Sequence, residues 1–126
     1  MISGIGVDIV RISRIERVIC RWGDRFIKRV FTPFEIERCS ERPSPCSAFA
    51  LRFAAKEAFS KAIGLGMRKG VRWRDIEIFN HAGGRPGLRL YGLCAQLCEE
   101  RGVGRKHLSL SDDGDYGIAM VVLEVQ

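Results

Sequence analysis

A mostly apolar segment near the middle of this 126-residue chain reads Phe49-Ala50-Leu51-Arg52-Phe53-Ala54-Ala55-Lys56-Glu57-Ala58-Phe59-Ser60-Lys61-Ala62. Its alanines and long side chains favour a helix, which we expect from about Ser47 to Ile63, with Gly64 and Gly66 ending it. A helix this apolar belongs to the core of its domain. It nevertheless carries Glu57, and a buried carboxylate is costly unless it is paired, hydrogen-bonded or bound to a metal.

Toward the N-terminus, a second carboxylate interrupts the run Gly4-Ile5-Gly6-Val7-Asp8-Ile9-Val10. We expect a strand from Ile2 to Val10, with Ile5, Val7 and Ile9 on one face. Asp8 falls on the opposite face with Gly4 and Gly6, whose missing side chains leave room beside it. Two carboxylates in core-like segments, each next to glycine or lysine, indicate a hard-cation site built for a phosphate-bearing substrate.

The remaining pattern alternates helices with strands. Further helices are expected over residues 12–29, from the Thr32-Pro33 capping box onward, and over residues 91–101. Further strands are expected over residues 71–79 with a bulge near Asp75, around 88–90, over 107–111 and over 116–125. Because strands meet in hairpin turns at residues 80–86 and 112–115, we predict one α+β domain over residues 1–126, with an antiparallel sheet packed against helices.

Composition narrows the partners and the compartment of the chain. The formal net charge of +6 predicts an acidic partner: nucleic acid, an anionic membrane, an acidic protein or a phosphorylated small molecule. No apolar stretch approaches the ~18–20 residues that cross a bilayer, and the N-terminal residues lack the pattern of a signal peptide. The five cysteines form no CxxC motif, and Cys94 and Cys98 are expected to be small buried hydrophobes. We therefore expect a cytoplasmic protein.

An arginine ridge accompanies the apolar stripe of the first predicted helix. The stripe is Ile12, Ile15, Ile19, Trp22 and Phe26, and the ridge is Arg11, Arg14, Arg21 and Arg25, each one position before a member of the stripe. Arginines in such a pattern usually lie on a face of the helix that is exposed to solvent. Glu16 and Asp24 are the only acids in the stretch, however, and unpaired arginines repel one another, so the ridge favours docking of an acidic partner.

Glu57 and Lys61 share a face of the predicted central helix because they are four residues apart. A surface ion pair is the commonest meaning of this spacing, but the neighbouring residues leave little polar surface. A carboxylate near a lysine and Ser60 can hold magnesium while the lysine neutralises a phosphate. Asp8 and Glu57 supply the one or two protein carboxylates that magnesium usually takes.

His107 opens the predicted strand over residues 107–111. Alternation places His107, Ser109 and Ser111 on one face, opposite Leu108 and Leu110. A lone histidine is more often structural than functional, but a polar row on a strand otherwise suited to the core weakens that interpretation.

Three segments together resemble the holo-acyl-carrier-protein synthases, the short group of the 4′-phosphopantetheinyl transferases. They are residues 4–12, residues 53–64 with Lys-Glu-x-x-x-Lys, and residues 107–111 with His-x-Ser-x-Ser. The resemblance covers nearly the whole chain, in the family's order and near its spacing. It implies transfer of 4′-phosphopantetheine from coenzyme A to a serine of apo-acyl carrier protein, as in fatty acid biosynthesis, with release of adenosine 3′,5′-bisphosphate.

The resemblance also implies roles for single residues. Asp8 and Glu57 would hold Mg²⁺ against the coenzyme A pyrophosphate, and Glu57 and Lys61 would be catalytic, with Lys61 stabilising charge on that phosphate. The coenzyme A site would comprise Arg52, Ser60, Lys61, Gly64, Arg85, Pro86 and His107. The acidic carrier protein would dock on Arg14, Arg21 and Arg25. Family members are typically homotrimers with active sites between subunits.

Some alternatives stay open at this level. The family often has a histidine where this chain has Asp112, so Asp112 receives no role. The attacking hydroxyl needs a base, which Glu57 or a metal-bound water could provide. A rival interpretation is a basic module without catalysis that binds an acidic protein, such as the carrier protein, or nucleic acid. It leaves Asp8 and Glu57 unexplained, and a nucleic-acid binder has no use for carboxylates beside its phosphate-binding surface. We expect neither nucleic acid nor a membrane as partner.

Overall fold

Two antiparallel sheets and five helices make up the chain, which a computed structural model describes over all 126 residues. The strands are β1 (Ile2–Arg11), β2 (Ile76–Asn80), β3 (Pro86–Leu90), β4 (Val103–Asp113) and β5 (Tyr116–Val125). The helices are α1 (Ile12–Trp22), α2 (Asp24–Val30), α3 (Pro33–Ser40), α4 (Pro45–Ile63) and α5 (Gly92–Glu100), and a 3₁₀ turn, η1, spans Trp73–Asp75.

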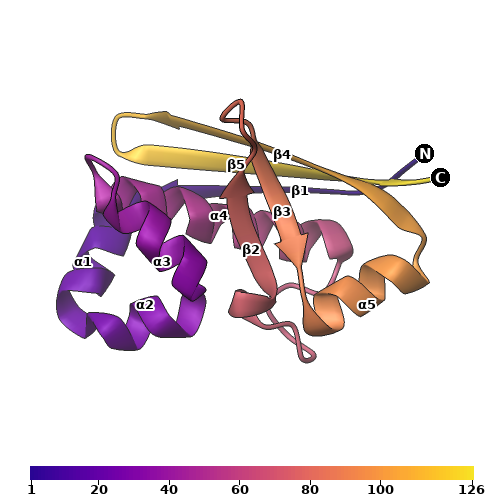
Figure 1. Cartoon of the computed structure of the whole chain (residues 1–126), viewed down its shortest axis with the longest axis horizontal. Helices are drawn as coiled ribbons and strands as arrows, with labels where there is room; N and C mark the ends of the chain where they lie inside the picture. The colour runs from indigo at the N-terminus through magenta and orange to yellow at the C-terminus, as the bar shows by residue number, and fades with distance from the viewer.

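The larger sheet has the strand order β1-β5-β4, with both pairs antiparallel, and β2 and β3 form a separate hairpin. Figure 1 shows α4 running along one face of the larger sheet, with the hairpin crossing in front of it. Helices α1 to α3 lie at one end of the molecule and α5 at the other, near the paired chain termini. The predicted α+β fold with an antiparallel sheet against helices is confirmed.

Gly4 and Gly6 allow α4 to lie directly on β1. A Cβ atom built on Gly4 would overlap the carbonyl oxygen of Ala62, and one built on Gly6 would overlap that of Ala58. A larger residue at either position would push the helix off the strand. The glycines beside Asp8 therefore make room for the whole helix that carries Glu57.

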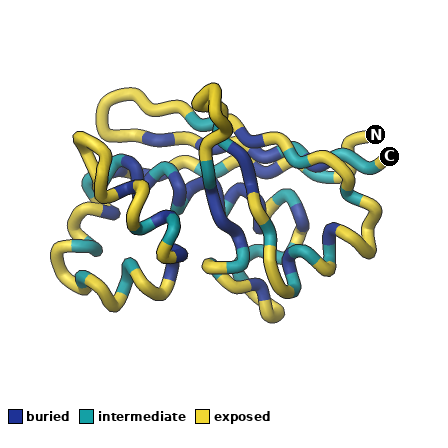
Figure 2. The backbone as a smooth tube through the Cα atoms, viewed as in Figure 1, coloured by how far each residue is buried: buried dark blue, intermediate teal, exposed yellow.

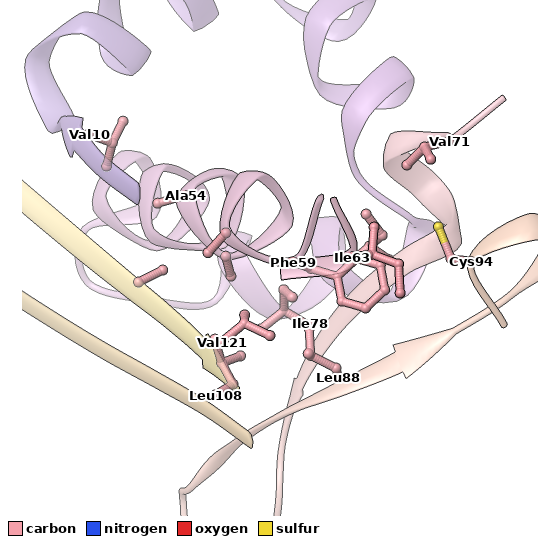
Figure 3. Packing of buried hydrophobic residues seen from close by; sticks show 14 of the residues in the cluster. Val10, Ala54, Phe59, Ile63, Val71, Ile78, Leu88, Cys94, Leu108 and Val121 are labelled. Carbon is pink, nitrogen blue, oxygen red and sulfur yellow. The ribbon is translucent and has the colours of Figure 1, made fainter. Parts of the chain in front are cut away.

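The core surrounds α4, which touches the sheet, the hairpin and the N-terminal helices (Figure 2). Figure 3 shows Phe59 and Ile63 of α4 beside Ile78 of the hairpin and Val121 of the sheet, all of them buried. A smaller cluster beneath α2 and α3 comprises Val30, Phe31, Cys39, Ala48 and Phe49. Contact with so many elements explains why α4 is apolar on most of its circumference.

The opposite face of the larger sheet is apolar but exposed. Between 41% and 65% of the surface of each of its residues is accessible, and these residues are Ile5, Val7, Ile9, Ile118 and Met120. We call this set the outer apolar face. The expectation that the whole first strand belongs to the core is therefore wrong for this side of β1. An exposed apolar patch marks an interaction surface.

The helix predicted over residues 12–29 is two helices in the structure. Gly23 has a φ of +54° and separates α1 from α2. The predicted apolar stripe is interrupted there, because Ile12 and Ile15 are buried whereas Trp22 is 47% exposed. Apolar periodicity alone does not reveal such a break, since an isolated glycine is tolerated within a helical pattern.

The segment before the hairpin also differs from the prediction. Residues 73–75 form η1 instead of a strand, so that β2 begins at Ile76 and the bulge predicted near Asp75 is wrong. Helix α4 begins at Pro45, a favourable first residue, and β4 is longer than the predicted strand over residues 107–111.

The cysteines behave as the sequence indicates. All five are free thiols, and Cys94 and Cys98 are buried in the core, where burial raises the pKa of Cys94 to about 12. None of the helices combines the length and the apolar character needed to cross a membrane.

Candidate active site

Asp8 and Lys61 meet where α4 crosses β1. The Lys61 ammonium donates hydrogen bonds to Asp8 Oδ1 and to the carbonyl oxygen of Val7, both at 3.0 Å. The carboxylate of Asp8 is largely shielded, whereas about half of the Lys61 side chain is accessible. The packing of α4 on the two glycines thus brings together residues that are 53 positions apart.

Glu57 lies one helical turn before Lys61 and within the electrostatic reach of Asp8. Partial burial raises the pKa of Glu57, Asp8 raises it further, and Lys61 lowers it. Asp8 and Glu57 line one cavity of about 310 Å³, whose other wall is α1, with Arg14, Ile15 and Val18. The predicted convergence of Asp8, Glu57 and Lys61 therefore occurs in the structure, and Arg14 lies beside it.

This pair of carboxylates fits a hard cation by its donor chemistry. No group of three or more His, Cys, Asp or Glu side chains that could hold a metal ion occurs in the chain. Magnesium does not need one, because it usually binds through one or two protein carboxylates and completes its shell with water and substrate phosphate. Burial and then the charge of Asp8 raise the pKa of Glu57, and Lys61 offsets this only in part.

Ser60 lies in the last turn of α4, and Gly64 is the cap that follows it. The Ser60 side chain is buried and donates a 2.7 Å hydrogen bond to the carbonyl oxygen of Glu57. Its own carbonyl oxygen accepts hydrogen bonds from the amides of Gly64, Leu65 and Gly66. Gly64 is exposed and has a φ of +89°, which suits the helix end. In this structure Ser60 has a structural role, and its predicted contact with coenzyme A stays a prediction.

Arg52 is a buried guanidinium without a carboxylate partner. It is only 5% exposed, donates to the carbonyl oxygen of Ala48 and to Asn80 Oδ1, and leaves its Nε without a partner. Arg42 donates to the same Asn80 oxygen, and all three residues line a cavity of about 290 Å³. Because two guanidinium groups share one neutral acceptor, this cavity favours the binding of an anion. Arg42 and Asn80 were not predicted, because nothing in their spacing connects them to Arg52.

Arg85, Pro86 and His107 line another cavity, of about 340 Å³, together with Arg105 and Lys106. The imidazole of His107 forms a hydrogen bond with the carboxylate of Glu124. This cavity shares no lining residue with the one at Asp8 and Glu57. Within one chain, the residues predicted to bind coenzyme A are therefore divided among separate cavities.

The predicted docking residues are exposed, and none of them forms an ion pair. Arg21 lies 5.2 Å from the ring centre of Trp22, and Arg25 belongs to α2 because of the break at Gly23. Arg25 and Trp22 line a cavity of about 450 Å³ between the two helices. The surface thus combines unpaired positive charge with exposed apolar area.

Sequence analysis did not predict the buried ion pair of Lys56, the residue that precedes Glu57. Lys56 is fully buried, and its ammonium donates to Glu35 Oε1 at 2.8 Å and to the carbonyl oxygens of Trp73 and Ile76. Burial lowers the pKa of Lys56, and Glu35 opposes that change. The sequence suggested only that Glu35 caps α3, which it does through Thr32. The long separation between Glu35 and Lys56 hid their contact.

Comparison with known proteins places this geometry in a family. The model of the 4′-phosphopantetheinyl transferase superfamily matches residues 4–121. The chain belongs to this superfamily. It is 48% identical to the holo-[acyl-carrier-protein] synthase of Koribacter versatilis over 124 residues, which cover 98% of this chain and 99% of the relative. The prediction that the chain is an enzyme of the holo-[acyl-carrier-protein] synthase type is confirmed.

Solved structures of such transferases share the fold. The crystal structure of holo-[acyl-carrier-protein] synthase from Neisseria meningitidis matches with a TM-score of 0.90 and 43% identity, covering 98% of this chain and 99% of that one. The enzyme from Helicobacter pylori, in complex with coenzyme A, matches with a TM-score of 0.84 and 33% identity, covering 95% and 99%. The similarity spans the whole transferase domain and includes an enzyme seen with coenzyme A.

Proposed function

We propose that this transferase moves 4′-phosphopantetheine from coenzyme A to a serine of apo-acyl carrier protein in a Mg²⁺-dependent reaction of fatty acid biosynthesis. The observation that carries the proposal is the placement of Asp8 and Glu57 on one cavity, with Lys61 hydrogen-bonded to Asp8 and Arg14 on the facing wall. It combines two carboxylates for a cation with a lysine for a phosphate and an arginine for an acidic partner.

In the proposed reaction, the carrier serine oxygen forms a bond to the phosphorus that bears pantetheine. The bond from that phosphorus to the bridging oxygen of the pyrophosphate breaks, and adenosine 3′,5′-bisphosphate leaves with the electron pair. Magnesium, held by Asp8 and Glu57, would neutralise charge on the pyrophosphate. Lys61 would orient and neutralise the same phosphate. The serine proton passes to a base, for which Glu57, with its raised pKa, and a water molecule are the candidates.

The nucleotide end of coenzyme A would use the other cavities. Arg52 and Arg42 offer positive charge without a carboxylate partner, as a phosphate requires. Arg85, Pro86 and His107 would contribute from their own cavity. Because these residues and the pair of carboxylates do not share a cavity in one chain, we propose that a second copy completes each site.

The outer apolar face supports such an assembly. Its isoleucine, valine and methionine side chains are exposed on β1 and β5, and an apolar surface of this kind favours burial against another chain. We propose a homotrimer, as the resemblance to the family implies. The cytoplasmic location stays a prediction.

Mass spectrometry tests the proposed function directly. Apo-acyl carrier protein is incubated with this enzyme, coenzyme A and Mg²⁺, and the carrier should gain the mass of one phosphopantetheine group. Omission of Mg²⁺ or the change Glu57→Ala should abolish the gain while the circular dichroism spectrum stays that of the wild type. No gain with the wild-type enzyme would contradict the proposal and favour a binding module. Transfer by Glu57→Ala at the wild-type rate would contradict the metal assignment.

A further inference from the structure

Helix α1 is capped by a residue that lies more than one hundred positions away. Arg11 precedes the helix and provides no side-chain cap. The turn between β4 and β5 supplies the cap instead: the Ser13 amide donates to Asp115 Oδ1 at 2.9 Å, and the Ser13 hydroxyl donates to Asp115 Oδ2. The amide of Ile12 also donates to the carbonyl oxygen of Asp115 at 2.7 Å.

The carboxylate of Asp115 supplies the negative charge that the first turn of α1 lacks. Its first turn has no acidic residue, so the positive end of the helix dipole has no charge partner within the helix. The hydrogen bonds from Ser13 lower the pKa of Asp115, with a smaller contribution from Arg11 and Arg17, so its carboxylate is ionised at neutral pH. Asp115 thus satisfies two amides and one hydroxyl and places a negative charge at the start of α1.

The position of α1 matters for the active-site cavity. Arg14 follows the capped Ser13 directly, and Arg14, Ile15 and Val18 form the wall that faces Asp8 and Glu57. At its other end the helix stops at Gly23, whose φ is +54°. The capped end is therefore the fixed point from which Arg14 is directed toward the cavity.

We propose that Asp115 is a positioning residue for the carrier protein. It anchors α1 so that Arg14 and the cavity wall hold the docked carrier at a fixed position relative to Glu57. The proposal rests on the proposed function, since it assumes that the carrier docks on α1. Asp115 itself need not touch the carrier.

Two substitutions of Asp115 distinguish its anchoring of α1 from the effect of its negative charge. Asp115→Ala removes the carboxylate and both side-chain bonds to Ser13 but keeps the backbone bond from Ile12, whereas Asp115→Asn keeps an oxygen that can accept from Ser13 and removes the charge. If Asp115 acted only by repelling an acidic carrier, both variants would bind the carrier more tightly. Anchoring predicts instead that Asp115→Ala weakens carrier binding and that Asp115→Asn does not.

The experiment is steady-state transfer to apo-acyl carrier protein with each substrate varied in turn. We expect Asp115→Ala to raise the KM for the carrier about three- to tenfold, the scale of a lost N-cap, while the KM for coenzyme A stays within about twofold. Asp113→Ala is the matched control, because it removes a carboxylate from the end of β4, beside the same turn, and Asp113 makes no side-chain hydrogen bond to α1. It should leave both KM values unchanged.

Amide hydrogen exchange provides a second measurement that does not depend on activity. Exchange of residues 12–15 should accelerate in Asp115→Ala and remain near wild type in Asp115→Asn and Asp113→Ala. An unchanged or lower carrier KM in Asp115→Ala would overturn the proposal. Absence of transfer by the wild-type enzyme would instead overturn the proposed function, so the two failures are distinguishable.

Discussion

Lys61 donates a 3.0 Å hydrogen bond to Asp8 across the junction of α4 and β1, although Glu57 lies one helical turn away on its own helix. The ammonium therefore occupies one of the two carboxylates that we assign to Mg²⁺. Because Lys61 bonds one oxygen of Asp8, the ammonium and a cation compete for the charge of this carboxylate, and a lysine that left it could contact the substrate phosphate.

Removal of this lysine should separate metal binding from catalysis. Because the ammonium competes with the cation for Asp8, Lys61→Met should tighten Mg²⁺ binding by the free enzyme, by up to about fivefold for a partly exposed pair. Transfer should fall, since the phosphate loses its positive partner. Isothermal titration with Mg²⁺ measures the first effect, and Lys28→Met, which breaks the exposed pair with Asp24, is the control. Weaker Mg²⁺ binding by Lys61→Met would contradict the competition.

The pKa of Glu57 should respond to Asp8. Burial is the main cause of the raised pKa of Glu57 and the charge of Asp8 is the second, so Asp8→Asn should lower that pKa without removing the effect of burial. ¹³C NMR of the Glu57 carboxyl in metal-free enzyme measures it. A pKa that does not move would show that the two carboxylates do not interact.

The raised pKa of Glu57 also determines how this residue makes the stability of the fold depend on pH. With a folded-state pKa above the ordinary 4.5, Glu57 keeps its proton in the folded protein at pH values where the unfolded chain has lost it. Its contribution to stability is therefore present below about pH 4.5 and is lost as the pH rises through the raised pKa. Binding of Mg²⁺, which needs the ionised carboxylate, should weaken as the pH falls through the same range.

The buried pair of Lys56 and Glu35 should dominate the stability of the junction between α3 and α4. Lys56→Met leaves the Glu35 carboxylate buried without its partner and should cost about 3–5 kcal/mol of unfolding free energy. Adding Glu35→Gln should recover part of that loss, because no charge then remains buried. Urea denaturation measures both variants. Equal stability of Lys56→Met and wild type would show that the pair is not buried in solution.

Arg14→Glu should weaken docking of the carrier without affecting coenzyme A. The change reverses a charge on the cavity wall, so the carrier KM should rise about tenfold and most strongly at low salt, where charges are least screened. Arg74→Glu makes the same charge change at an exposed position in η1 and is the control. Equal effects of the two variants would assign the loss to net charge and not to the α1 surface.

The outer apolar face should hold the assembly together. Val7→Glu places a charge in the middle of this face and should convert a trimer of 14.2 kDa chains into monomers, measured by light scattering after size exclusion. Gln96→Glu, on the exposed side of α5, should leave the mass unchanged. A monomeric wild-type enzyme would contradict the proposed assembly.

Local patterns were sufficient for most elements of the fold. The apolar stretch over residues 49–62 predicts α4, and the alternation and turns predict the strands and the hairpins, because periodicity and turn chemistry act over a few neighbouring residues. The break at Gly23 and the 3₁₀ turn at Trp73 were missed, since both depend on how the chain packs and not on the pattern alone.

The sequence by itself determined which groups we propose for the chemistry: the carboxylates of Asp8 and Glu57, Lys61 on the face of Glu57, and the arginines of α1. Only the tertiary structure decided their partners. It paired Lys61 with Asp8, buried Lys56 against Glu35, separated His107 from the carboxylates and capped α1 with Asp115. These contacts join residues 21 to 102 positions apart, and a distance in space between such residues follows from packing, which no local pattern records.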